Sequence, residues 1–194
     1  AGGGVYSDNG NITLSGTAVT GNKADWGGGF HITSGTKLTI AGGSISVNQA
    51  SLGSGAYLDS AGTIIAAGST VEDTIYNEGR IEPKAESTAE TDFRGEVTNS
   101  GTISGGAFSG AVINSGTISG GTFSNTVTNK STIENGTFNG KVICAGSAAD
   151  GNASGPLSGG TIKGGTYAQP IEMKAGTVYT DEKLAVVDGS HLLT

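Results

Sequence analysis

Apolar residues return at regular intervals along the chain, and the interval differs between its two parts. In the first part, segments that open GGGVY, GGGFH and GSGAY begin at Gly2, Gly27 and Gly53, a spacing of 25 and then 26 residues. Matched positions within these segments are apolar together: Val5, Phe30 and Ala56; Ile12, Leu38 and Ile64; Val19, Ile45 and Val71. Self-similarity at a fixed period indicates a stack of similar structural units.

From about residue 75 the interval shortens to 15 residues. The segments VTNSGTISGGAFSGA, VINSGTISGGTFSNT and VTNKSTIENGTFNGK follow one another from Val97, Val112 and Val127. More divergent copies begin at Ile75 and Val142, each interrupted by extra residues, and a last copy covers roughly 171–179. The repeats therefore continue through most of the chain, but each later unit is shorter.

Within the 15-residue unit, apolar and polar residues alternate as they do in a β-strand. Every second residue of 108–114 should face the same side. Each unit then has about three inward positions, which form one Val/Ile column, one Ile column and one aromatic column. The aromatic column comprises Phe93, Phe108, Phe123, Phe138 and Tyr167. Thr, Ser, Gly and Asn dominate the units and no apolar stripe of helical period occurs, so we expect no helices.

A unit this short cannot bury enough apolar surface to fold alone, so neighbouring units must cover one another. Stacked units pair their backbones as parallel strands about 4.7–4.9 Å apart. We predict an all-β fold, a single-stranded right-handed parallel β-helix (β-solenoid) with wide 25–26-residue coils followed by narrow 15-residue coils. The wide part covers 1–74 and the narrow part 75–180, and 181–194 is a C-terminal cap or the start of another module.

An asparagine recurs at the end of one strand in each narrow unit. These residues are Asn77, Asn99, Asn114 and Asn129. Because stacking places like on like, we predict an inward ladder of amides that bond to one another and to the turn backbone. Cys144 falls in the next position of this column, where we expect a buried structural thiol rather than a reactive one.

Tyr6, His31 and Tyr57 occupy one matched position in the wide units, next to residues expected to point inward. They form a predicted outward column, and this column is our candidate binding site. Exposed rings there would stack on sugar faces or contact a partner protein. The alternative is that they pack on one another as a cross-strand ladder over a glycine-rich strand. Trp26, matched by Leu52, is expected to plug a corner of the solenoid.

Two insertions interrupt the narrow units. Residues 82–92 carry several carboxylates, for which a solvated loop, a calcium site and an acid/base pair are the alternatives. Arg94 is expected to pair with Asp92, and Arg80 with Glu78, on the surface. The segment 145–158 is rich in Gly, Ser and Ala and is typical of a flexible excursion.

Composition narrows the function further. The chain carries 17 acidic and 10 basic residues in 194, for a net charge of −7, which disfavours nucleic acid and anionic lipid as partners. It has no apolar run long enough to span a membrane, and one cysteine allows no internal disulfide. Familiar hydrolase, zinc and phosphate-loop motifs are absent, so we predict no catalytic residues, no metal and no cofactor.

The GGGVY and GGGFH openings and the S-G-T-x-V/I pattern resemble the parallel β-helix repeats of bacterial adhesin-type surface proteins, including the pectin-lyase-like superfamily. The GTISGGTFS style of repeat is similar to tandem arrays in large secreted or wall-anchored proteins of gut Firmicutes. The resemblance implies a fragment of a larger extracellular protein at the bacterial cell surface.

We accordingly expect a non-catalytic stalk or adhesin-like module that presents a binding surface to a glycan or to a host or cell-surface protein. A polysaccharide-active lyase or hydrolase is the alternative from another class. An ice-binding solenoid is a minor alternative, suggested by the recurring outward threonines Thr102, Thr117, Thr132 and Thr161.

Overall fold

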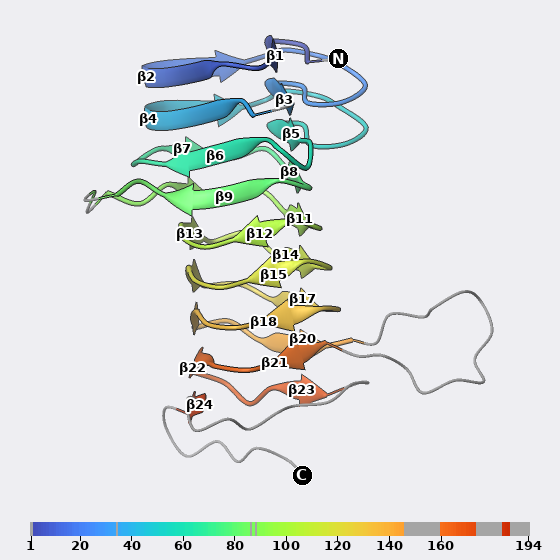
Figure 1. The fold of residues 1–194 in the computed structure, drawn as a ribbon, viewed down its shortest axis with the longest axis vertical. Coiled ribbons are helices and arrows are strands. Elements are labelled where there is room, and N and C mark those ends of the chain that lie inside the picture. Colours follow the sequence, from blue (N-terminus) through green and yellow to red (C-terminus); the bar gives the residue numbers. More distant parts are fainter. Residues whose placement is uncertain are drawn as a thin grey trace, which may run out of the picture.

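The computed structural model describes residues 2–33, 35–85, 87, 89–145, 160–173 and 184–186. In this part of the chain every named strand pairs in parallel with its neighbours and no helix is present. The chain winds into a column of stacked coils that runs from the N-terminal end to the C-terminal end (Figure 1). The fold is a parallel β-helix, as the repeats predict.

One wall of the column is a nine-stranded sheet, in which each coil contributes one strand. Its strands, in spatial order, are β1 (Val5–Asp8), β3 (Phe30–Thr33), β5 (Ala56–Leu58), β8 (Ile75–Asn77), β11 (Val97–Asn99), β14 (Val112–Asn114), β17 (Val127–Asn129), β20 (Val142–Cys144) and β23 (Glu172–Met173). The first three belong to the wide coils and the other six to the narrow coils.

The other wall is a fifteen-stranded sheet that divides into two limbs. It begins with the long strands β2 (Asn11–Thr20) and β4 (Lys37–Ser46). The first half of β4 continues into β6 (Thr63–Ala66), β9 (Arg80–Pro83), β12 (Thr102–Ile103), β15 (Thr117–Ile118), β18 (Thr132–Ile133) and β21 (Thr161–Ile162). Its second half continues into β7 (Thr70–Val71), β10 (Asp92–Phe93), β13 (Ala107–Phe108), β16 (Thr122–Phe123), β19 (Thr137–Phe138), β22 (Gly165–Tyr167) and β24 (Leu184–Val186).

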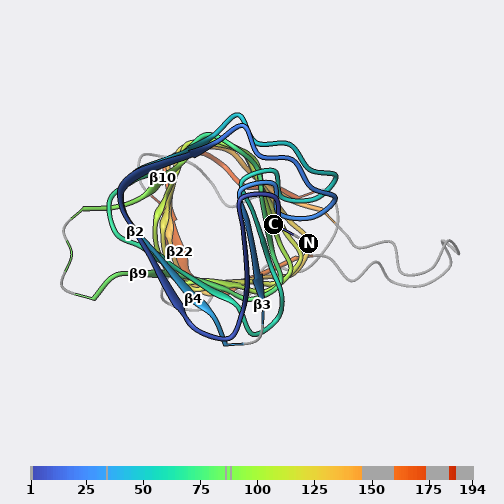
Figure 2. The same ribbon diagram turned by 90° about the horizontal axis from the view of Figure 1, so that it is seen from above.

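The register of the strands confirms the apolar columns that the repeats predict. The described strands pair Val5 with Phe30 with Ala56, Ile12 with Leu38 with Ile64, and Val19 with Ile45 with Val71. The third coil is an intermediate case, because Ala56 pairs with Ile75 only 19 positions later. In the first two coils the extra residues form an arch between the second sheet and the first, at one corner of the section (Figure 2).

The interior of the narrow part is filled by the predicted aromatic column. The rings of Phe93, Phe108, Phe123, Phe138 and Tyr167 stack with centroid separations of 4.8–4.9 Å. That separation is the strand spacing itself, so the rings meet face to face without any distortion of the coils. The last member needs a partner for its hydroxyl, and Tyr167 donates to the carbonyl of Gly164 at 2.9 Å.

The asparagine ladder is also present, and each amide is fully buried. The Nδ2 atoms of Asn77, Asn99 and Asn114 donate to the Oδ1 atom of the next asparagine at 2.6, 2.7 and 2.7 Å. Further bonds run from the amides to turn carbonyls such as Gly116 O. The ladder begins at Asn77, whose Oδ1 has no hydrogen-bond partner among the described residues, because the coil above supplies Leu58 at this position.

The column continues beyond Asn129 to Cys144, as expected from the repeats. Cys144 is completely buried, and burial raises the pKa of its thiol while a hydrogen bond with Asn129 acts in the opposite direction. A thiol held in its protonated form and out of contact with solvent is unreactive. These properties fit the structural role expected for Cys144.

Two predictions concern segments that the structure describes only in part. The excursion expected over 145–158 lies outside the described residues except for Ala145. Of the terminal segment 181–194, the described part is β24, which pairs with β22 and so adds one more strand to the second limb. This strand belongs to the segment predicted to be a C-terminal cap or the start of another module.

Replacing the central amide should destabilise the narrow coils strongly. In Asn114→Leu, the Nδ2 atom of Asn99 and the Oδ1 atom of Asn129 both lose their short ladder bond and keep only longer bonds to the turn backbone. Loss of two buried hydrogen bonds should lower the free energy of unfolding by about 1–3 kcal/mol. Denaturant titration followed by circular dichroism measures this loss. Ser115→Ala, at the exposed neighbouring position, is the control and should change little; equal stability of the two variants would contradict the ladder's role.

Four of the coils that carry the aromatic column have a glycine two positions before the ring, at Gly106, Gly121, Gly136 and Gly165, whereas the coil of Phe93 has Thr91. A Cβ added at Gly121, where φ is +112°, would lie 3.3 Å from the Cε2 atoms of both Phe108 and Phe123. Gly16 has a φ of +58°, but a Cβ there would meet nothing within 4 Å. Gly16→Ala should therefore lower the free energy of unfolding only by the cost of the left-handed backbone conformation, about 1–2 kcal/mol. Gly121→Ala adds crowding of about 1–3 kcal/mol, and thermal unfolding of the two variants measures the difference.

Candidate functional site

The predicted outward column lies on the nine-stranded sheet and has four members rather than three. Tyr6 pairs with His31, His31 with Tyr57, and Tyr57 with Tyr76. Tyr76 was missed because its segment was assigned to the narrow units, although Ile75-Tyr76-Asn77 matches the apolar-aromatic alternation of Ala56-Tyr57-Leu58. Trp26 joins these four rings from the arch that leads into β3. We call the five residues the aromatic patch.

The rings of the patch touch one another in a continuous series. His31 packs edge-on against Tyr6 and Tyr57, with centroid distances of 5.3 and 5.0 Å. Tyr57 lies between two stacked neighbours, Trp26 at 5.4 Å and Tyr76 at 5.2 Å. The ring of Trp26 also contacts the ring of His31, with a centroid distance of 6.2 Å. The indole therefore contacts rings from two successive strands, β3 and β5. Contacts of this kind hold each ring in one orientation.

Exposure differs sharply among the members. Trp26 and Tyr6 remain 47 % and 51 % exposed, whereas His31 and Tyr57 are each only 7 % exposed. The prediction of an outward column is therefore correct in register, but His31 and Tyr57 do not form an open surface. Trp26, expected to plug a corner, instead lies outside the sheet on these rings. The arch of the wide coil makes this possible, because it holds the indole outside the strands.

A row of polar residues runs beside the patch on the same face. Asp8 and Thr33 end β1 and β3, and Asp59 and Glu78 directly follow β5 and β8, each two positions after a ring of the patch. Residues two apart in a strand share a face and lie about 7 Å apart. The Oδ1 atom of Asp8 accepts a hydrogen bond from Thr33 at 2.9 Å. We call Asp8, Asp59 and Glu78 the acidic row.

The acidic row affects the pKa of Tyr57. Burial, followed by the negative charges of Glu78 and Asp59, raises the pKa of its hydroxyl to about 12. Both carboxylates thus lie close enough to influence a ring of the patch. The repeat pattern of the sequence did not predict that these carboxylates lie beside the rings of the aromatic patch.

The raised pKa gives a pH dependence of stability. An unfolded tyrosine ionises near pH 10, so folding that keeps Tyr57 protonated stabilises the protein fully below about pH 10. This contribution is lost as the pH rises from about 10 to 12. Denaturant midpoints measured across this range should fall, and Tyr57→Phe should make the fall smaller. Tyr6→Phe serves as the comparison, and if both variants flatten the curve equally, Tyr57 is not its source.

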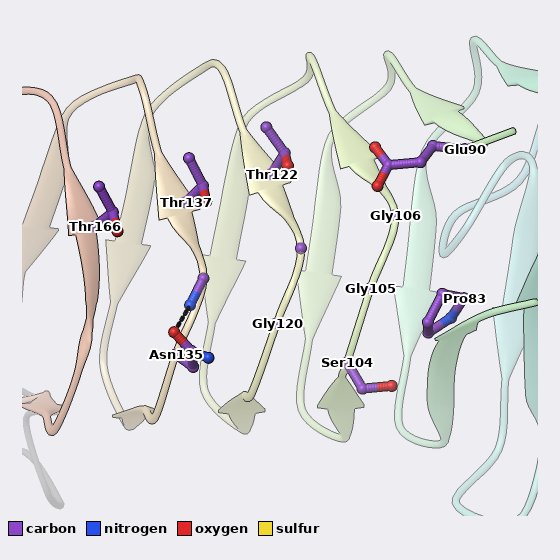
Figure 3. Close-up of a pocket in the computed structure, with 12 residues that line it drawn as sticks. Pro83, Glu90, Ser104, Gly105, Gly106, Gly120, Thr122, Asn135, Thr137 and Thr166 are labelled. Carbon is purple, nitrogen blue, oxygen red and sulfur yellow. Dashed lines mark hydrogen bonds between the residues drawn. The ribbon is translucent and has the colours of Figure 1, made fainter. Parts of the chain in front are cut away.

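A second surface feature is a shallow groove along the corner between the two limbs of the larger sheet. Its volume is about 350 Å³. One edge carries the hydroxyls of Thr122, Thr137 and Thr166, and Glu90 and Pro83 lie at one end (Figure 3). The groove exists because glycines such as Gly105 and Gly120 occupy the corner and leave no side chain there. It contains one carboxylate and no aromatic ring, so it offers fewer recognition groups than the patch.

The acidic loop takes part in a surface network. The Nε atom of Arg94 donates to Asp92 at 2.8 Å, as predicted, and its Nη1 atom donates to Glu72 at 2.9 Å. Burial alone would raise the pKa of Asp92, but hydrogen bonds from Arg94 and Ser109, together with the charge of Arg94, bring it below its ordinary value. Among the described residues no group of three or more His, Cys, Asp or Glu side chains is arranged to hold a metal ion.

The partner predicted for Arg80 is wrong. Its Nε atom lies 2.5 Å from Glu82 Oε1, rather than near Glu78. Residues 80 and 82 both belong to β9 and point to the same side, whereas Glu78 directly follows β8 of the other sheet. Because Arg80 pairs with Glu82, the carboxylate of Glu78 is not held by Arg80 and lies beside the aromatic patch.

Comparison with known proteins adds no family to this description. No protein-family model, no curated protein and no solved structure matches the chain. In the part of the chain that the structure describes, no helix has the length and apolar character needed to cross a membrane.

Proposed function

We propose that this chain is a non-catalytic carbohydrate-binding module of an extracellular bacterial surface protein. In this proposal the solenoid is the rigid stalk and the aromatic patch contacts the glycan. The likeness of the repeats to those of adhesin-type surface proteins supports the location. The stacking of Trp26 on Tyr57 is the observation that carries the binding function.

A tryptophan ring in this arrangement suits a sugar ring. One face of Trp26 lies against Tyr57, with a 24° angle between the planes, while nearly half of the residue stays exposed. The free area of the indole is thus held ready for a second flat, apolar surface such as the C–H face of a pyranose. Because the ring is already fixed by its neighbours, binding loses little side-chain entropy.

The distribution of exposed apolar side chains also places the proposed binding surface on the wide coils. Among the described residues, the large apolar side chains that remain exposed are Tyr6, Trp26, Val47 and Leu52. All four belong to the wide coils or their arches, and none belongs to the narrow part. The part of the molecule that exposes its large apolar side chains is where an interaction surface is expected. The narrow coils then serve as the support.

Truncation of the exposed indole tests the proposal. On an array of neutral and charged glycans, Trp26→Ala should weaken binding roughly three- to tenfold, since one aromatic stacking contact contributes about 0.5–1.5 kcal/mol. Ser115→Ala is the control, because Ser115 is an exposed residue of the narrow coils, outside the proposed interaction surface. It should leave the affinity unchanged.

Two outcomes would contradict the proposal. Absence of binding to any glycan, together with Trp26-dependent capture of a purified surface protein, would make the patch a protein-binding site. Release of reducing ends from a polysaccharide, abolished by Asp92→Ala, would make the chain an enzyme.

A further inference from the structure

The carboxylates of the acidic row have no lysine or arginine partner among the described residues, and Asp59 faces His31. In the described residues, lysines and arginines form ion pairs with Glu72, Glu82, Asp92, Glu134 and Glu172. None of these pairs involves Asp8, Asp59 or Glu78. The chain as a whole carries a net charge of −7, so these carboxylates lie in an already negative field. A positive group brought to this row would be attracted at long range and held at short range.

A second, independent feature lies at the same place. His31 is 7 % exposed, and neither of its ring nitrogens has a hydrogen-bond partner among the described residues. Its Nε2 atom faces Asp59 Oδ1 at 3.7 Å, which is beyond hydrogen-bond distance. A buried polar group without a partner costs about 1–3 kcal/mol. An imidazole that is buried between Tyr6, Trp26 and Tyr57 with neither ring nitrogen hydrogen-bonded calls for an explanation.

The spacing of the two features fits one sugar residue with its substituents. Asp59 and Glu78 follow adjacent strands, and the backbone N–H of Glu78 bonds to the carbonyl of Leu58 at 2.9 Å. Their carboxylates therefore lie on neighbouring coils, about 4.8 Å apart at the backbone. They stand two positions beyond Tyr57 and Tyr76, about 7 Å along the strands. A pyranose stacked on Trp26 would reach them with a substituent or with the next sugar in the chain.

We propose that the aromatic patch and the acidic row together bind an amino sugar whose amine is free and protonated. The pyranose ring stacks on Trp26, and the ammonium group donates hydrogen bonds to Asp59 and Glu78. An ammonium carries three N–H donors and no acceptor, which matches two neighbouring carboxylates that no lysine or arginine occupies. The inference rests on the proposed glycan-binding function and adds the chemical class of the glycan.

A matched pair of ligands tests this class. Soluble β-1,4-linked oligomers of glucosamine and of N-acetylglucosamine have the same ring and linkage, but only the first carries a charge. In mildly acidic buffer, titration calorimetry should show the glucosamine oligomer to be the tighter ligand. Asp59→Asn and Glu78→Gln should each weaken it about fivefold, in line with about 1 kcal/mol for a partly exposed ion pair. Added salt should weaken the same ligand and spare the acetylated one.

The control for charge is Glu82→Gln, which removes a carboxylate already paired with Arg80 in the other sheet. It should leave both affinities unchanged. Equal binding of the two oligomers, with no effect of Asp59→Asn or Glu78→Gln, would overturn the inference while leaving glycan binding intact. Binding of neither oligomer, or of any other glycan, would overturn the proposed function itself. Charge-dependent binding that survives Trp26→Ala would exclude the stacked pose.

Discussion

Parallel hydrogen bonding between successive coils is the constraint on which the rest of the structure depends. Each strand of the nine-stranded sheet pairs in register with the equivalent strand of the next coil. This register places each side chain above its counterpart, about 4.8 Å away. Only side chains that can contact copies of themselves are then suitable inside: phenylalanine through its faces, asparagine through its donor and acceptor, and branched aliphatic residues through their methyl groups. The Phe and Asn columns are direct results of that requirement.

The same constraint explains why so much of the fold could be predicted from the repeats. Spacing alone gave the partner of Phe108 and of Asn114, because a solenoid converts sequence separation into spatial adjacency. The apolar columns, the two ladders and the place of Cys144 follow from counting. The intermediate length of the third coil was less evident, since its shortening falls in the arch and leaves the apolar positions unchanged.

The candidate site was harder to predict, because it depends on contacts that cross the repeat. Trp26 lies in the arch that leads into β3, but its ring stacks on Tyr57, which belongs to β5 of the next coil. Nothing in the spacing of the repeats encodes this reach, and it is this ring that covers His31 and Tyr57. The partner of Arg80 is a similar case: Glu78 and Glu82 are equally near in sequence, and only the corner between the sheets decides between them.

The narrow coils have one further property, which follows from the identity of their upper and lower surfaces. A coil such as residues 112–126 presents Val112, Asn114, Ile118 and Phe123 to both neighbours, and receives the same four residue types from residues 97–111. Gain or loss of one such coil by tandem duplication or deletion would leave every contact type in place. The reach of the stalk can therefore change in steps of one strand spacing, while the surface at the other end keeps its shape.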